Sequence, residues 1–176
     1  MTCMRRGCAA AFSAVLLLGC NYERPQPQPK AAPQAMKGLL SGEPVSFDVN
    51  VLLSDKAMKT LAASKETIVV RAYICGQPAI GTNKKTLEAC PDSGDIVLSE
   101  VEAERATPGI FPFSRVRLSK DLLSQVDRTD YELLINVYSG RKSSENNLLD
   151  CGIYQGSFRA VQEHPIEIRC KLIYGE

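Results

Sequence analysis

Four cysteines downstream of residue 70 are the residues with the clearest capacity for chemistry: Cys75, Cys90, Cys151 and Cys170. Thiols can bind zinc, exchange electrons or form disulfides. Structural zinc sites usually take two ligands from within a few residues, whereas the closest two of these cysteines are fifteen positions apart. The same spacing excludes a Cys-x-x-Cys redox pair. We therefore expect two disulfides and no bound metal.

The phase of the surrounding residues indicates how the four cysteines pair, among three possible pairings. Cys151 keeps step with Leu149 and Ile153, and Cys170 keeps step with the apolar residues of 166–172, so both should point inward from neighbouring strands. The other two cysteines end one predicted strand and directly precede the next. The sequence therefore predicts the pairs Cys75–Cys90 and Cys151–Cys170.

Residues able to support catalysis are scarce. The single histidine, His164, precedes Pro165 in a polar stretch and is interpreted as a solvated turn residue. A zinc-protease motif needs a second histidine, and the chain has no G-x-S-x-G or phosphate-binding glycine loop. One Asp92-Ser93-Gly94 cannot form the two-carboxylate site of an aspartic protease, and Asp127 and Asp130 read as solvated turn residues. We predict no enzymatic activity and no cofactor.

The N-terminus has the layout of a secretory signal. Arg5 and Arg6 precede an uncharged, mostly apolar stretch at 9–18. This stretch has roughly ten residues, whereas a membrane-spanning helix needs about 20. We therefore expect it to direct export without becoming a permanent membrane span.

The end of that stretch, Leu17-Leu18-Gly19-Cys20, resembles the lipobox of bacterial lipoproteins. The resemblance implies that residues 1–19 are a signal peptide, that the thiol of Cys20 carries a diacylglyceryl group, and that the mature chain begins there. Asn21 is not the aspartate that favours inner-membrane retention in such lipoproteins. We therefore expect an outer-membrane protein, held by its acyl chains and facing the periplasm.

Residues 20–38 form the predicted lipidated cysteine and tether. Prolines at 25, 27, 29 and 33 fix the backbone and remove hydrogen-bond donors, which favours an extended segment outside any core. At about 3.1 Å per residue, it could hold a domain on the order of 50 Å from the lipid.

The remaining residues, 39–176, suffice for one domain. Removing Arg5 and Arg6 from the 21 Lys and Arg leaves 19 against 20 Asp and Glu. The two signs are mixed along the chain, so nothing indicates a nucleic-acid partner.

A period of two dominates this domain and predicts an all-β fold. The clearest strand is VSFDVNVLL, where Val45, Phe47 and Val49 alternate with polar residues. About seven strands are predicted, at 45–53, 67–74, 95–104, 112–119, 131–138, 148–158 and 166–174. Two sheets packed as an antiparallel β-sandwich, immunoglobulin-like or transthyretin-like, fit this number, with a closed barrel as the alternative.

Two short helices are predicted between the strands. Asp55 should cap a helix that groups Met58, Leu61 and Ala62 on one side. Ser119 should cap a second helix, with its apolar side formed by Leu122, Leu123 and Val126.

The longest polar segments between strands, 76–94 and 139–147, are the expected binding surfaces, because loops on a rigid sandwich often carry function. In the second loop Arg141, Lys142 and Glu145 are the predicted partner-binding residues. Replacing 140–146 by a Gly-Ser linker is expected to keep the thermal midpoint within a few degrees and to weaken partner capture.

The preferred function is therefore a non-enzymatic docking or assembly module of the cell envelope, with a protein partner. The overall plan is similar to the transthyretin-like lipoprotein of the type VI secretion membrane complex. The alternative is a periplasmic enzyme inhibitor resembling the lipoproteins that inhibit lysozyme, with Ser139-Gly140-Arg141 as the inhibitory loop. A hydrolase is the third class.

Overall fold

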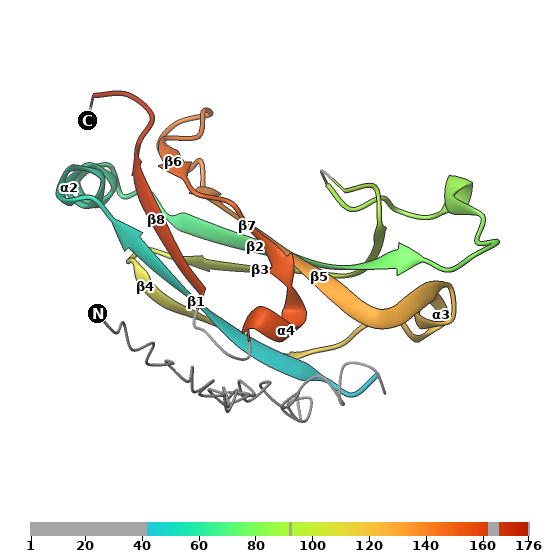
Figure 1. Ribbon diagram of the computed structural model, residues 1–176. Helices are drawn as coiled ribbons and strands as arrows, with labels where there is room; N and C mark the ends of the chain where they lie inside the picture. The colour runs from blue at the N-terminus through green and yellow to red at the C-terminus, as the bar shows by residue number, and fades with distance from the viewer. Residues whose placement is uncertain (1–41, 92, 162–165, 176) are drawn as a thin grey trace, which may run out of the picture. The chain divides into compact units, whose positions relative to one another are not determined.

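The computed structural model describes residues 42–91, 93–161 and 166–175. Within these ranges the chain forms eight strands, three short α-helices and one 3-10 turn (Figure 1). The strands are β1 (Val45–Leu53), β2 (Ile68–Pro78), β3 (Ile96–Arg105), β4 (Gly109–Val116), β5 (Val126–Ser139), β6 (Leu149–Cys151), β7 (Tyr154–Ser157) and β8 (Ile166–Leu172). The helices are α2 (Asp55–Ser64), α3 (Lys120–Leu123) and α4 (Phe158–Val161), and the 3-10 turn is Lys84–Thr86.

The eight described strands form two four-stranded sheets. Sheet A has the order β4-β1-β8-β6, and sheet B has the order β3-β2-β5-β7. Strands β1 and β8 pair in parallel, and the other pairs are antiparallel. The predicted β-sandwich is thus confirmed. In immunoglobulin domains the first two strands are neighbours, whereas here β1 pairs with β4 and β8.

The core lies between the inner faces of the sheets, as the alternating sequence pattern predicts. In β1 Ser46 and Asp48 are exposed, and the buried residues are Val45, Phe47, Val49 and Val51. The ring of Phe47 stacks on Phe113 of β4 at 4.9 Å and meets Phe158 of α4 edge-on at 5.9 Å. Strands β2 and β5 contribute the opposite wall of the core with their own alternating residues: Ile68, Val70, Ala72, Ile74, Tyr131, Leu133, Ile135 and Val137.

The predicted strand 148–158 is wrong as a single element. Strand β6 pairs with β8 in sheet A, and β7 pairs with β5 in sheet B, so the chain crosses between sheets at Gly152 and Ile153. The side chain of Ile153 is 62% exposed instead of pointing inward. The crossing ends the alternation that linked Ile153 to Leu149, and Phe158 begins α4.

The two predicted helices exist with different details. The N-cap of α2 is Ser54, whose hydroxyl accepts the N–H of Ala57 at 3.2 Å, and not Asp55. Of the predicted apolar side only Leu61 is buried, together with Ala57, whereas Met58 is 44% exposed and Ala62 is exposed.

Ser119 occupies the N-cap position of α3, although its side chain makes no cap hydrogen bond. This helix is one turn long, and Val126 already belongs to β5.

Both predicted disulfides are present. Cys151 and Cys170 face each other across β6 and β8 and join the main core. Cys75 and Cys90 are buried on the outer face of sheet B, where they pack with Val97 and Leu134. The bridge thereby fastens the long β2–β3 segment to the sheet.

Several predicted features lie outside the described residues: the signal peptide, Cys20 and the tether, and also His164 and Asp92. Within the described ranges, no helix has the length and apolar character needed to cross a membrane.

Candidate functional site

A buried carboxylate, Glu66, lies at the junction of α2 and β2. Helix α2 ends because Lys65 adopts a left-handed conformation (φ 57°), and the N–H of Glu66 then donates to the carbonyl of Leu61 at 2.9 Å. The residue is only 2% exposed. A charged group so far from water requires several hydrogen bonds.

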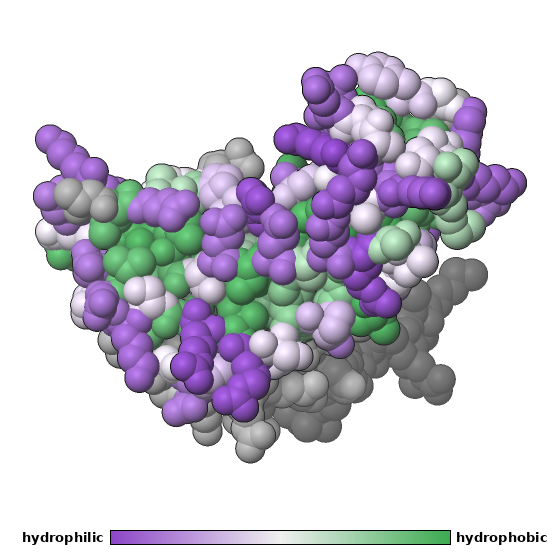
Figure 2. Space-filling model, turned by 180° about the vertical axis from the view of Figure 1, so that it is seen from behind, coloured by the Kyte–Doolittle hydropathy of each residue, from purple (hydrophilic) through white to green (hydrophobic). Residues whose placement is uncertain are grey.

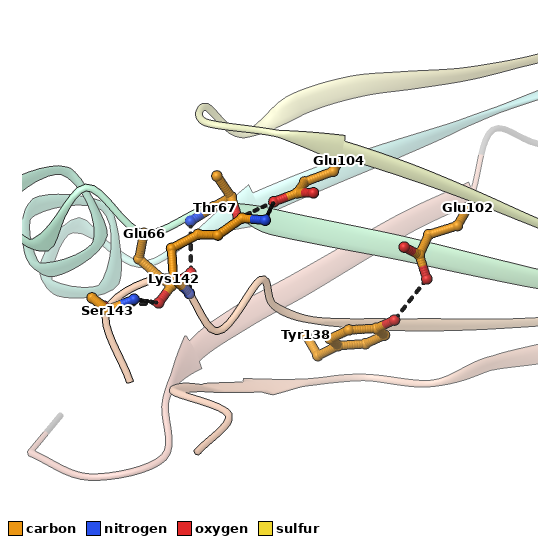
Figure 3. Close-up of polar contacts among 7 residues, drawn as sticks. All are labelled: Glu66, Thr67, Glu102, Glu104, Tyr138, Lys142 and Ser143. Atoms are coloured by element: carbon orange, nitrogen blue, oxygen red, sulfur yellow. Dashed lines mark hydrogen bonds and ion pairs between the residues drawn. The ribbon is translucent and has the colours of Figure 1, made fainter. Parts of the chain in front are cut away.

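Four hydrogen bonds satisfy this carboxylate, and three come from the segment between β5 and β6 (Figure 3). Oε1 accepts the backbone N–H groups of Thr67 at 2.9 Å and Lys142 at 3.0 Å. Oε2 accepts the N–H of Ser143 at 2.8 Å and its hydroxyl at 2.7 Å. Glu66 therefore acts as an anchor for a loop that is distant in sequence.

The hydrogen bonds determine the charge state of Glu66. Burial raises the pKa of this carboxyl, but the N–H groups of Lys142, Ser143 and Thr67 and the Ser143 hydroxyl together lower it, from 4.5 to about 2. The group is therefore ionised throughout the neutral range, and its bonds to the loop are charge-assisted.

Additional bonds complete the β5–β6 loop, defined here as residues 140–148. The N–H of Gly140 donates to the carbonyl of Thr67 at 2.9 Å. At the loop base, the amide oxygen of Asn147 accepts the N–H of Ser139, and the Ser139 hydroxyl accepts the N–H of Leu148, each at 2.9 Å. Backbone groups thus have fixed partners at both ends of the loop.

Glycine is required at position 140. A Cβ atom there would lie 1.9 Å from Oγ1 of Thr67 and 2.9 Å from Oε1 of Glu104. The Thr67 hydroxyl donates to that same carboxylate oxygen at 2.6 Å. Any side chain at 140 would therefore displace Thr67 or Glu104 and disrupt the hydrogen bond between them.

The three predicted partner-binding residues have different environments in this loop. Lys142 Nζ forms an ion pair with Glu104 at 3.0 Å, and its backbone binds Glu66. Arg141 and Glu145 are exposed, and neither has an ion-pair partner among the described residues. Arg141 adopts a left-handed conformation (φ 57°). The loop thus uses Lys142 internally and leaves Arg141 and Glu145 for external contacts.

The contacts change the expectation for replacement of the loop by a Gly-Ser linker. Such a linker would remove the Ser143 hydroxyl and the specific backbone geometry that satisfy the buried carboxylate of Glu66. We therefore expect loop replacement to destabilise the domain, so single side-chain changes are the better test of binding.

The outer face of sheet B has a second polar cluster, and it is satisfied internally. The guanidinium of Arg71 binds Glu102 at 2.6 Å, lies 3.4 Å from Glu100, and lies over the ring of Tyr138. The Tyr138 hydroxyl donates to Glu102 at 2.9 Å (Figure 3). Burial, followed by this hydrogen bond, raises the pKa of Tyr138 to about 12. The cluster links strands β2, β3 and β5, and its single guanidinium faces two carboxylates, so it keeps a net negative charge.

A groove of about 520 Å³ runs between β3 and β4, the edge strands of the two sheets. Val101, Ala103, Phe113 and Val116 contribute its apolar lining. From behind, the molecule shows apolar surface between rows of hydrophilic side chains (Figure 2).

Acidic residues surround a hollow of about 370 Å³ at the start of β5: Asp95, Asp130 and Glu132. Asp127 and Asp130, predicted as turn residues, belong to β5. Among the described residues, no three His, Cys, Asp or Glu side chains are placed to bind a metal ion together.

The candidate functional site is therefore the β5–β6 loop, which Glu66 holds in place and on which Arg141 and Glu145 are exposed. No family model, curated protein or solved structure matches the chain.

Proposed function

We propose that this protein is a lipid-anchored component of the bacterial cell envelope that docks a protein partner and catalyses no reaction. The observation that carries the proposal is the β5–β6 loop, whose backbone is fixed by the carboxylate of Glu66. The anchor rests on the lipobox-like sequence that ends at Cys20. The absence of an aspartate at position 21 supports an outer-membrane location, and we place the domain on the periplasmic side of that membrane.

A loop ordered before binding favours tight association. Binding by a disordered loop costs about 0.5 to 1.5 kcal/mol for each side chain that must be immobilised, in addition to the backbone ordering. Here the backbone at Lys142 and Ser143 already has its hydrogen bonds. Arg141 and Glu145, which carry opposite charges, are then available to recognise complementary charges on a partner.

The anchor is tested by Cys20→Ser. Without a thiol at this position no diacylglyceryl group can be attached, so we expect complete loss of labelled palmitate and release of the protein from the membrane fraction. Cys3→Ser, within the signal, serves as the matched control and should label normally. Unchanged labelling of the Cys20→Ser variant would contradict the lipoprotein assignment.

Docking is tested by reversing the two free charges of the loop. In Arg141→Glu with Glu145→Lys, we expect the affinity for the envelope partner to fall at least tenfold, or about 1.4 kcal/mol. The measurement is quantitative capture from solubilised envelopes, followed by titration of the captured protein. Asp48→Lys with Arg159→Glu reverses two exposed charges elsewhere and should leave capture unchanged. Equal capture by both variants would place the contact surface outside the loop.

The inhibitor alternative receives less support from the geometry. Ser139 is fully buried, and Gly140 packs against Thr67. Of the three residues Ser139-Gly140-Arg141, only Arg141 can therefore enter the cleft of an enzyme. A docking surface needs only the exposed side chains, so it is the function that these contacts favour.

A further inference from the structure

The groove between β3 and β4 has an unpaired strand edge as one of its walls. Strand β3 is the outermost strand of sheet B, with β2 as its single neighbour. The carbonyl of Leu98 accepts the N–H of Ser119 at 2.9 Å. Among the described residues, no backbone group of 99–104 has a hydrogen-bond partner outside sheet B. Such an edge is able to pair with a further extended segment.

The side chains of β3 alternate along this edge. Val101 and Ala103 are partly buried and pack against the main core, whereas Glu100 and Glu102 are exposed on the outer face of sheet B. The single guanidinium of Arg71 faces these two carboxylates. A segment that pairs with β3 therefore needs apolar side chains toward the groove, and a cation on its opposite face would complement the excess carboxylate.

The β4 wall of the groove adds apolar lining and two cations. Phe113 and Val116 line the groove, and Arg115 and Arg117 are exposed beside them. Neither guanidinium forms an ion pair with a carboxylate in the part of the chain that the structure describes. The excess negative charge on β3 therefore stays without a salt-bridge partner from β4.

The described chain begins at one end of this groove. Gly42 and Arg117 line a common hollow, and Arg117 also lines the groove. Gly42 lies in a turn and has a φ of 77°, a conformation typical of glycine where a chain changes direction. The six residues before it, 36–41, span about 20 Å when extended, and the 99–103 wall of the groove spans about 16 Å. This segment is therefore long enough to cover the wall from its attachment at Gly42.

The residue pattern of 36–41, MKGLLS, matches the two faces of β3. In an extended segment Met36 and Leu40 share one face, and Lys37 and Leu39 share the other. With the first two toward the apolar lining, Lys37 lies on the face that carries the β3 carboxylates. The chain at 21–35 contains four prolines, which cannot donate hydrogen bonds to a neighbouring strand. Residues 36–41 are therefore the part of the N-terminal chain suited to this edge.

We infer that residues 36–41 pair with β3 as an additional strand of sheet B and cover the β3–β4 groove, with Met36 and Leu40 inside. The segment runs antiparallel to β3, because the bond between Leu98 and Ser119 places the Gly42 end of the groove beside the start of 99–103. This inference concerns a surface that the proposed function does not use.

The pairing has a consequence for the docking loop, which rests on the proposed lipid anchor. From Gly42 the segment reaches back along β3, so Met36 lies toward Ala103. Beside that end of β3, Glu104 pairs with Lys142 of the β5–β6 loop at 3.0 Å. The chain toward the anchor therefore leaves the domain next to the loop instead of at the opposite end. This favours a docking partner that is held at the same membrane.

A tryptophan reporter tests the pairing, because the chain contains no tryptophan. Leu40→Trp and the adjacent control Leu39→Trp are each introduced into the full chain, and the processed protein is purified in detergent. In Leu40→Trp the indole lies in the groove, so we expect emission at shorter wavelength and loss of quenching by iodide. The indole of Leu39→Trp lies on the solvent face and should behave as an exposed tryptophan. Equal emission and equal quenching would contradict the inference.

Hydrogen exchange of residues 99–104, measured by mass spectrometry, provides the second arm. Met36→Lys with Leu40→Lys places two ammonium groups against the apolar lining and should abolish the protection of this edge. Leu39→Lys with Ser41→Lys adds the same charge on the face of the carboxylates and should preserve it. These positions lie outside the described residues, so the variants leave the packed core unchanged.

The outcomes separate the pairing from the anchor. Equal protection of 99–104 in the two lysine variants would contradict the pairing. Protection that increases with protein concentration would assign the groove to a second copy of the chain and overturn the inference. Neither arm requires the lipid, so failure to incorporate palmitate would overturn the anchor and leave the pairing intact.

Discussion

Glu66→Gln is expected to lower the free energy of unfolding at pH 7 by about 3 kcal/mol, since the pKa of this carboxyl falls from 4.5 to about 2 on folding. An amide presents one oxygen in place of two, so at least one of the donors at Lys142 and Ser143 loses its acceptor. Chemical denaturation followed by circular dichroism measures the difference.

The direction of the pKa shift determines how the stabilisation by Glu66 depends on pH. The folded pKa is the lower one, so the stabilisation from ionised Glu66 is fully present above about pH 5.5 and is lost as the pH falls through 4.5 towards 2. The difference between wild type and Glu66→Gln should therefore shrink over this window. Glu104→Gln, which removes an exposed carboxylate beside the same loop, should have only a small effect. A difference between wild type and Glu66→Gln that stays constant down to about pH 2.5 would contradict the role of the charge.

Removal of both disulfides is expected to unfold the domain at 37 °C. Bridges that close 15 and 19 residues contribute on the order of 3 kcal/mol each through the entropy of the unfolded chain. Their sum of about 6 kcal/mol compares with the roughly 5 to 15 kcal/mol that stabilises a typical domain. Thermal denaturation of the four-alanine variant at 75, 90, 151 and 170 tests this, with each two-alanine variant as an intermediate case.

The two bridges should also react with reductant in a fixed order. Cys75 and Cys90 are both buried beneath the β2–β3 segment, whereas Cys151 is partly exposed. In the native protein the Cys151–Cys170 bridge is therefore expected to be reduced first, as measured by alkylation and mass spectrometry. Simultaneous loss of both would indicate that reduction occurs only from the unfolded state.

Local patterns predicted the strands and the disulfides because burial alternates along a strand. The alternation in β1 follows the sequence residue by residue, and the phases of Cys151 and Cys170 led to the correct pair. The crossing at Gly152 was missed because Leu149, Cys151 and Ile153 continue the same alternation in the sequence, although Ile153 is exposed in the structure. Which sheet receives β7 depends on pairing with β5, and no short stretch of sequence encodes that choice.

The sequence analysis also did not identify Glu66 as the residue that holds the β5–β6 loop, although the strand pattern contains a signal for it. Glu66 is in phase with Ile68 and Val70, so the strand pattern places it on the core side. A carboxylate in that phase needs donors, but those donors are backbone groups 76 and 77 positions away. Every residue except proline has a backbone N–H group, so residue types do not indicate which N–H groups bind a carboxylate. The sequence could therefore indicate that Glu66 is unusual, and only the fold identifies its partners.

The parallel pairing of β1 with β8 joins the beginning and the end of the domain. Val49 lies opposite Ile166, and Leu53 lies opposite Cys170, so the centre of sheet A has a very high contact order. Such topologies fold slowly, in milliseconds to seconds, because a long chain must close before the contact forms. A chain that emerges N-terminus first from a ribosome or a translocation channel therefore cannot complete this sheet until 166–172 arrives. Until then β1 presents an open edge, and a chain ending before β8 is expected to aggregate through it.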